Sequence, residues 1–196
     1  KMGVIVRVSR EILEDSANAS SFIDSILAEA AAAELDRVVL EGSGAGEEPR
    51  GILSHSDILE EDVSAAVDWD SFIAAHKKIR DKNGEPGAII MPPSVAETLA
   101  SLKINSEDNH YAMAPAGVGD LPRFVTSKLG TDKAVLGDFS QVVVGIRSGI
   151  EVVASELASG TNNSGFGRDE VLIKLRWRGD VAVLRPTHIA QLTNIS

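Results

Sequence analysis

The stretch from Ser16 to Leu53 constrains the fold of this chain more than any other. Apolar residues recur there with the three- and four-residue spacing of one helix face: Phe22, Ile23, Ile26, Leu27, Ala30, Ala31, Leu35, Val38 and Val39. Ser21 and Asp24 have the spacing of a capping box, so the helix is predicted to begin at Ser21 and to run about 30 Å. Gly42 follows as the stop signal, and a short return strand is predicted at 52–53.

Size and composition narrow the class of protein. A chain of 196 residues can bury one good core or two small ones. No apolar run approaches the ~18 residues of a membrane span, and the absence of cysteine excludes disulfides and thiolate metal sites. The net charge of −10 argues against a nucleic-acid-binding module. It suits either simple solubility or a container wall that repels the phosphates of its cargo.

The remaining pattern alternates short strands and helices. Strands are predicted at 4–8 and 88–91 from their β-branched and apolar residues. Asp68 is predicted to cap a helix at 69–81, and Ser94, with Glu97 three residues later, is predicted to begin another. The acidic stretch at 54–67 and the Asn-, Pro- and Gly-containing stretch at 104–119 are predicted to be loops.

The last third of the chain is predicted to be mostly strand. Ser148 and Gly149 are predicted to form the turn of a hairpin between 142–147 and 150–153. Residues 168–178 alternate as one long strand. Gly179 and Asp180 are predicted to turn the chain so that 181–184 pair back, before a final short strand near 189–190.

The sequence contains no set of residues with the types and spacing typical of an enzyme active site. The four histidines, at positions 55, 76, 110 and 188, lack the spacing of a metal site. The glycine-rich run at 42–46 follows a helix rather than a strand and has no Gly-Lys-Ser/Thr, which excludes a phosphate-binding loop. We therefore predict no catalytic, cofactor-binding or metal-binding residues and no cofactor.

Four short motifs, taken in order and spacing, resemble the major capsid proteins of tailed bacteriophages, which have the Hong Kong 97 type fold. They are Ser-Arg-Glu-Ile-Leu-Glu-Asp-Ser at 9–16, the glycine stop and Pro-Arg-Gly-Ile-Leu at 42–53, Gly-Asp-Phe-Ser at 137–140, and the Arg-Pro segment at 185–190. The resemblance assigns a structural role to these motif residues: Ser9, Arg10, Glu11, Gly42, Gly44, Pro49, Gly51, Ile52, Leu53, Gly137, Asp138, Phe139, Arg185 and Pro186.

The resemblance implies an α+β subunit in which the long "spine" helix packs on the long strand. A peripheral domain is expected at 1–66 and 152–184, and an axial domain with a central sheet flanked by helices at 67–151 and 185–196. The family's N-terminal arm and extended hairpin loop are expected to be missing, which, with Met at position 2, is typical of a fragment.

The same resemblance implies a structural virion protein of a phage or prophage and no enzyme. It is expected to form a homo-oligomer of pentamers and hexamers, which close into an icosahedral shell around double-stranded DNA without sequence-specific binding. Assembly is expected in the bacterial cytoplasm, away from membranes, with a scaffold, a portal and a maturation protease as partners.

Three further expectations depend on the motifs. Some capsids of this type join a lysine to an asparagine with the help of a glutamate; Asp169 and Arg176 stand where the asparagine and glutamate would be, so no self-crosslinking is predicted. An encapsulin-like shell around a protein cargo is one alternative function. An unrecognised hydrolase is the alternative from another class.

Overall fold

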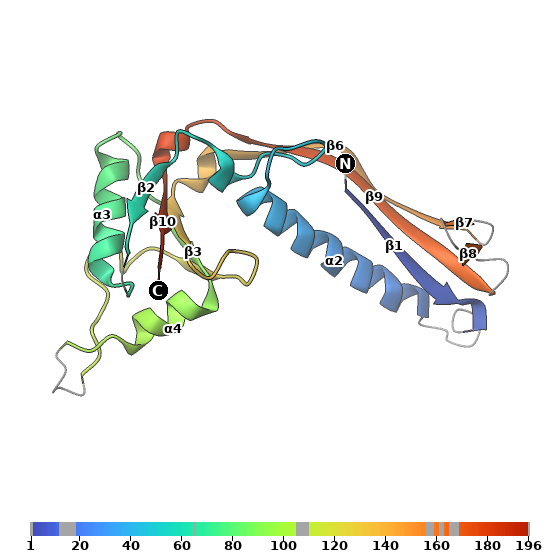
Figure 1. The fold of residues 1–196 in the computed structure, drawn as a ribbon, viewed down its shortest axis with the longest axis horizontal. Helices are drawn as coiled ribbons and strands as arrows, with labels where there is room; N and C mark the ends of the chain where they lie inside the picture. Colours follow the sequence, from blue (N-terminus) through green and yellow to red (C-terminus); the bar gives the residue numbers. More distant parts are fainter. Residues whose placement is uncertain are drawn as a thin grey trace.

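The computed structural model describes residues 2–11, 19–64, 66–104, 110–155, 159–160, 163–164 and 169–195. The molecule is elongated, with one long helix beside a narrow sheet at one end and a broader sheet with two helices at the other (Figure 1). The described residues form three sheets, with the strand orders β1-β9-β6, β2-β10-β5-β3-β4 and β7-β8. The third is a small pairing of β7 (Ser159–Gly160) with β8 (Asn163–Ser164).

The narrow sheet and the long helix form one region, here called the arm. The central strand β9 (Glu170–Val183) pairs antiparallel with β1 (Met2–Ser9) on one side and with β6 (Val142–Ser155) on the other. Helix α2 (Ala19–Glu41) runs along this sheet (Figure 1). The buried cluster between helix and sheet contains three residues of α2 and three of β9: Ile23, Leu27, Ala31, Val171, Ile173 and Leu175.

Only half of the predicted apolar face of α2 is buried. Ile23 and Leu27 face the sheet, whereas Phe22 and Ile26 are exposed. The predicted start at Ser21 is wrong, because the helix already includes Ala19 and places Ser21 inside it. The predicted stop is confirmed, since α2 ends at Glu41 and Gly42 follows.

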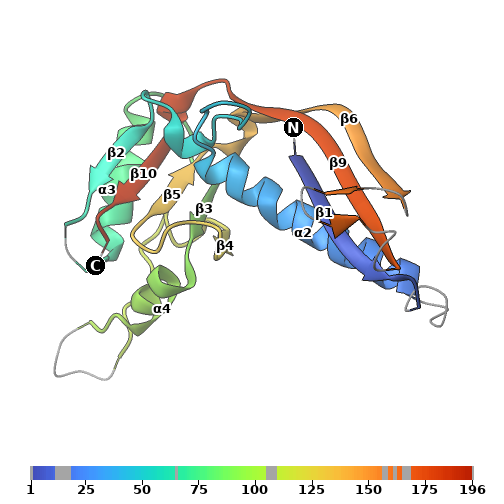
Figure 2. The same ribbon diagram turned by 45° about the vertical axis from the view of Figure 1, so that its right-hand side comes forward.

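The five-stranded sheet and its helices form the second region, here called the body. Figure 2 shows its strands in the order β2 (Leu59–Asp62), β10 (Ile189–Thr193), β5 (Ala134–Gly137), β3 (Ala88–Met91) and β4 (Arg123–Val125). The two end pairs, β2–β10 and β3–β4, are parallel, and the two inner pairs are antiparallel. This mixed sheet, with the helices of both regions, confirms a fold of mixed helix and sheet.

Helices α3 (Trp69–Arg80) and α4 (Pro93–Ser101) pack on one face of the five-stranded sheet. As predicted, Asp68 caps α3, because its side chain accepts a hydrogen bond from the Ser71 amide at 2.9 Å. The prediction for α4 is wrong in detail. The helix begins at Pro93, and Pro92 occupies the cap position without a side-chain hydrogen bond, because proline is well suited to the first turn of a helix.

Two predicted turns in the last third of the chain are wrong. Gly149 lies inside the continuous strand β6, whose register against β9 shifts between Ile146 and Glu151. Such a shift is a bulge, which absorbs small residues without reversing the chain. Gly179 lies inside the continuous strand β9, and a Cβ there would overlap the ring of Trp177. Both glycines therefore mark irregular strand positions rather than chain reversals.

Two further predictions are corrected around the acidic stretch. Residues 54–67 are not all loop, since Leu59–Asp62 forms β2, which pairs with β10. Residues 52–53 do not form a return strand; they belong to the 3-10 helix η1 (Ile52–Ser54). Strand β2 pairs with β10, a buried strand far along the chain. Its local sequence is acidic and looks like an exposed loop, so the local pattern alone does not predict a strand.

Candidate functional site

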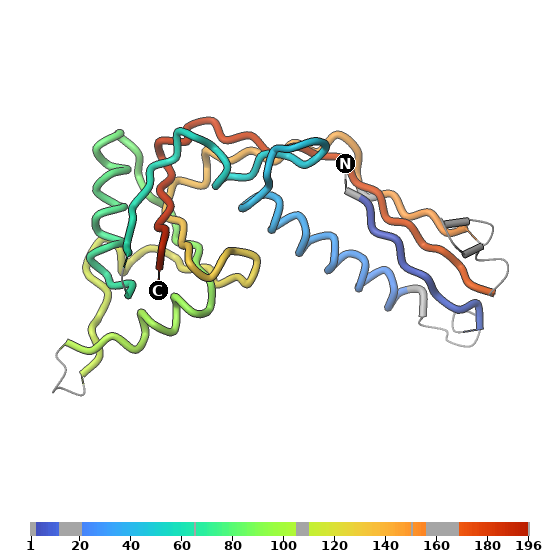
Figure 3. The backbone as a smooth tube through the Cα atoms, in the orientation of Figure 1, coloured from blue at the N-terminus to red at the C-terminus, as the bar shows by residue number. Residues whose placement is uncertain are grey.

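Three chain crossings, here called the junction, connect the arm to the body: 42–54, 138–141 and 184–188. Figure 3 shows these crossings near the N-terminus and along the upper edge of the molecule. The second contains the 3-10 helix η2 (Phe139–Gln141) and the third contains η4 (Pro186–His188). They are hydrogen-bonded to each other, because the Leu184 amide donates to the Gln141 carbonyl at 2.8 Å and the Asp138 amide donates to the His188 carbonyl at 3.1 Å.

Two glycines allow the first crossing to fold tightly against the end of α2. The Gly51 amide donates to the Gly42 carbonyl at 2.8 Å, and the Gly42 amide donates to the Val38 carbonyl at 2.9 Å. A Cβ on Gly42 would overlap the carbonyl oxygen of Pro49, and a Cβ on Gly51 would overlap the Gly42 nitrogen. Gly42 and Gly51 are therefore required by close backbone approach.

Gly44 and Pro49 form the base of the loop within this crossing. Gly44 has a φ of +68°, a left-handed conformation that glycine adopts without strain. Its amide donates to the Pro49 carbonyl at 3.3 Å, and the neighbouring residues Ser43 and Arg50 form a β-bridge. The Ser54 hydroxyl donates to the Gly42 carbonyl at 2.6 Å, which ties η1 to the start of the loop.

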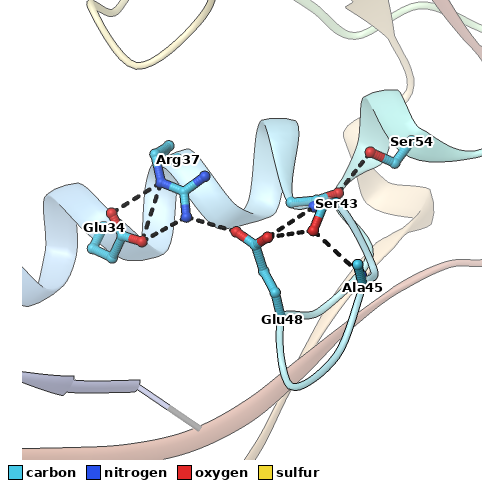
Figure 4. Close-up of polar contacts among 7 residues, drawn as sticks. Glu34, Arg37, Ser43, Ala45, Glu48 and Ser54 are labelled. Carbon is cyan, nitrogen blue, oxygen red and sulfur yellow. Dashed lines mark hydrogen bonds and ion pairs between the residues drawn. The ribbon is translucent and has the colours of Figure 1, made fainter.

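A charged network links α2 to this loop (Figure 4). The Arg37 guanidinium donates to both carboxylate oxygens of Glu34 at 3.0 and 3.1 Å from its Nε, and to Glu48 at 2.6 Å from its Nη2. Glu48 also accepts from the hydroxyl and the amide of Ser43. Hydrogen bonds from Ser43 and then Arg37 lower the pKa of Glu48 to about 2, so its carboxylate stays ionised at neutral pH.

The second crossing is held by the Asp138 side chain. Its carboxylate accepts from the Ser140 hydroxyl at 2.6 Å, the Ser140 amide at 3.1 Å and the Gln141 amide group at 3.1 Å. The hydrogen bond from Ser140 is the main cause that lowers the pKa of Asp138. Gly137, just before it, pairs with Ile189 of β10, and a Cβ there would lie 3.0 Å from the His188 carbonyl oxygen.

Apolar side chains close the junction from within. The buried residues of this cluster are Leu40, Ile52, Ile58, Leu129, Val135 and Ile189, and Leu53 and Phe139 pack against them. Arg185 precedes η4 and is exposed, whereas Pro186 is the first residue of η4 and is half-buried. Three of the four sequence motifs therefore meet here, although they are far apart in the chain.

The fourth motif lies elsewhere. Ser9 is the last residue of β1 and pairs with Glu170, and the Arg10 amide donates to the Asp169 carbonyl at 3.0 Å. Arg10 and Glu11 are exposed where the arm sheet ends, at the opposite end of β1 from the junction. The rest of this motif, 12–16, is outside the described residues. The structural role of all these motif residues stays a prediction.

The described part of the chain contains no group of three His, Cys, Asp or Glu residues that could hold a metal ion. Burial lowers the pKa of His55, which follows η1, and of His76, which lies in α3. Among the described helices, none has the length and apolar character required to cross a membrane.

Sequence reasoning missed the network around Arg37. The spacing of Glu34 and Arg37 was a usable signal, because residues three apart on a helix face each other. The involvement of Glu48 had no local signal, since it depends on how the loop folds back on the helix. The ion pairs are half-exposed, so their value lies in fixing geometry more than in stability.

Several solved structures share this fold. A chain from Mycobacterium phage Adephagia matches with a TM-score of 0.77 at 16% identity, covering 98% of this chain and 70% of that chain. A chain from Gordonia phage Cozz matches with a TM-score of 0.73 at 16% identity over 98% of this chain and 69% of that chain. The capsid of a native GTA particle, solved with C5 symmetry, matches with a TM-score of 0.73 at 15% identity over 100% and 72%.

At identities this low, the structural matches show that the fold is shared. No curated protein sequence matches the chain. The model of the phage capsid family matches residues 1–194, which is nearly the whole chain. The resemblance seen in the four motifs is therefore confirmed, and an encapsulin-like shell is not favoured. This chain belongs to the phage capsid family and is a major capsid protein, an oligomer-forming component of the virion shell.

Proposed function

We propose that this chain is a Hong Kong 97 type subunit that self-assembles into pentamers and hexamers of an icosahedral shell enclosing double-stranded DNA. The observation that carries the proposal is the distribution of exposed large apolar side chains over both ends of an elongated molecule. They include Ile5, Phe22, Ile26, Val152 and Val153 on the arm, and Tyr111, Met113, Phe124 and Val125 on the body. Exposed apolar surface on this scale is typical of protein interfaces.

We also propose that the subunit has two domains, in which the arm is the peripheral domain and the body is the axial domain. The strand pairings favour boundaries at the junction rather than at 66/67 and 151/152. Strand β2 is bonded to β10 of the body, and β6 is bonded to β9 of the arm along its whole length. Contacts at both ends of such a subunit suit head-to-tail rings, which close when the rotation between neighbours closes.

The chain's charge supports a container that does not bind its cargo tightly. A net charge of −10 repels phosphate, which disfavours non-specific binding of packaged DNA to the shell wall. We further propose that the protein acts without catalysis and depends on a scaffold, a portal and a maturation protease, as the family resemblance implies.

Self-crosslinking is not part of the proposed function. Arg176 stands where the helping glutamate would be, and its guanidinium forms an ion pair with Glu151 across β9 and β6. A cation cannot accept the proton that the glutamate would take from lysine. Mass spectrometry of assembled particles should detect only single chains after denaturation, and an isopeptide-linked peptide pair would contradict this.

Electron microscopy of the expressed protein tests the proposal. The chain should be expressed alone and together with the neighbouring head genes. Closed polyhedral particles that protect DNA from nuclease are expected. Particles that hold protein and no DNA would support an encapsulin-like compartment instead. Monomers alone in every preparation would contradict shell formation.

A further inference from the structure

The outer edge of β4 is an unpaired strand edge. Strand β4 pairs with β3 on one side only, and it is the last strand of the five-stranded sheet. The Ile89 amide donates to the Pro122 carbonyl and the Thr126 amide donates to the Met91 carbonyl, both at 3.0 Å. Because backbone groups alternate along a strand, the amides and carbonyls of Arg123 and Val125 point away from β3, where no described residue bonds to them.

The opposite edge of the same sheet is protected. In β2 the Glu60 carbonyl accepts a hydrogen bond from Lys78 of α3, and Lys78 also pairs with Glu61 at 2.7 Å. Charged side chains and lysines on an edge prevent pairing with other strands.

On β4, by contrast, Phe124 is 58% exposed and Val125 is 55% exposed. The charged residue of β4, Arg123, has its guanidinium over the Trp69 ring and donates to the Gly119 carbonyl. The β4 edge is therefore less protected against strand addition than the β2 edge.

Two cavities flank this open edge, one on each face of the sheet. A cavity of about 480 Å³ is lined by Phe124 together with Ile90 and with Phe139 of the junction. A second cavity, of about 600 Å³, is lined by Val125 together with Met91 and Trp69. Successive side chains of an added strand point to opposite faces, so they would enter the two cavities in turn. Strand addition of this kind takes its affinity from backbone bonds and its specificity from such pockets.

The chain carries a suitable counterpart at its other end. Strand β6 is the outer strand of the arm sheet, and its neighbouring residues Val152 and Val153 are 49% and 53% exposed. Since they are adjacent in a strand, one would point into each cavity. In the shell, the neighbours of a subunit are further copies of the same chain.

We propose that the outer edge of β4 adds an extended edge strand of a neighbouring copy of this chain, with the second copy's β6 as the segment that fits. This inference rests on the proposed self-assembly. It makes the contact heterologous, because the body of one subunit meets the arm of the next.

Val125→Pro is the most direct variant. Proline removes the amide that points to the open edge and leaves the bonds between β4 and β3 in place. Val125→Lys is the second variant, because an edge lysine discourages pairing without constraining the backbone. Ile73→Lys is the matched control, since Ile73 is an exposed apolar residue on α3, which packs over β2, β10 and β5.

The concentration at which particles form should rise about tenfold for both Val125 variants, which corresponds to a modest loss of contact free energy. The same concentration should not change for Ile73→Lys. Circular dichroism and unfolding of the subunit should match the parent protein. Unchanged assembly of both variants would overturn the inference while leaving shell formation intact. Failure of the parent protein to assemble would instead count against the proposed function.

A photo-reactive residue at position 125 identifies the occupant. Irradiated particles should give a cross-linked species of two chains, with peptides of β6 joined to position 125. A cross-link to a different protein, or only single chains from intact particles, would overturn the inference.

Discussion

The arm and the body bury their side chains to very different degrees. The body sheet has helices on one face and the junction cluster on the other, and all four residues of β5 are buried. The arm sheet is covered by α2 on one face, and the cluster between them has six buried members among the described residues. Phe72 in the body is completely buried, whereas Phe22 on α2 is 66% exposed.

This difference indicates two sources of stability within one chain. The body has the larger buried cluster, so it is expected to take its stability mainly from its own core. The arm is a thin layer whose exposed apolar residues remain in water until another surface covers them. The arm is therefore expected to gain much of its order from neighbouring subunits, and the following changes test that contrast.

The largest loss of stability is expected from Phe72→Ala. Phe72 has no solvent exposure and contacts the sheet from α3. Truncating a buried phenylalanine removes burial and leaves a cavity, at a cost of about 3–5 kcal/mol. Urea denaturation of the subunit measures this cost. A loss below about 1 kcal/mol would mean that the body does not depend on this core.

Leu27→Ala should have the next largest effect, confined to the arm. Leu27 is 1% exposed between α2 and the sheet, and its truncation should cost about 2–3 kcal/mol because a thin layer can partly collapse around the gap. Hydrogen exchange of β1 and β9 amides should rise while β5 stays protected.

Ile26→Ala is the matched control on the same helix. Its side chain is 44% exposed, so the subunit should lose less than about 0.5 kcal/mol. The same variant should weaken assembly if the outer face of α2 is covered by a neighbour. Equal losses for Leu27→Ala and Ile26→Ala in the subunit would contradict the burial difference between them.

Gly51→Ala tests the connection between arm and body. The new Cβ would overlap the Gly42 nitrogen and approach the Val38 and Leu40 carbonyls, so a loss of about 1–3 kcal/mol is expected from overpacking. Gly149→Ala is the control, because a Cβ there has nothing within 4 Å. Thermal unfolding should separate the two variants, and identical midpoints would contradict a tightly packed junction.

Acid should weaken the junction through Glu48. Its pKa is lowered from 4.5 to about 2, so its stabilising contribution is present above pH 4.5 and is lost as the pH falls toward 2. Glu48→Gln should be less stable at neutral pH and should lose less stability across that window. NMR titration of the Glu48 carboxyl checks the value directly. A midpoint near 4.5 would mean that Ser43 and Arg37 do not bind it in solution.

The sequence predicted elements whose signals are local. Asp68 identified the start of α3, and Gly42 identified the end of α2. Features that depend on pairing with distant strands were partly mispredicted: β2 was predicted to be loop, and Gly179 was predicted to be a turn. A glycine within a strand and a glycine in a turn look alike along the chain. In the folded molecule the Trp177 ring packs against Gly179 within the strand, and this contact cannot be read from the sequence.

The arrangement of the motif residues could not be predicted from the sequence, and their structural role stays a prediction. Gly42, Gly51, Asp138 and Pro186 were each singled out by motif resemblance, yet nothing in the sequence places them at one junction. The apolar stripe of α2 was predicted correctly in period, but its division into a buried half and an exposed half depends on the narrow width of the sheet beneath it.

Hydrogen exchange of the free subunit and of assembled particles is the most direct test of the contrast between arm and body. The amides of β5 and β10 should be protected in both states, because their strands lie in the middle of the body sheet. The amides of β1, β6 and α2 should exchange faster in the free subunit and gain protection on assembly. Equal protection of arm and body in the free subunit, unchanged by assembly, would contradict the account.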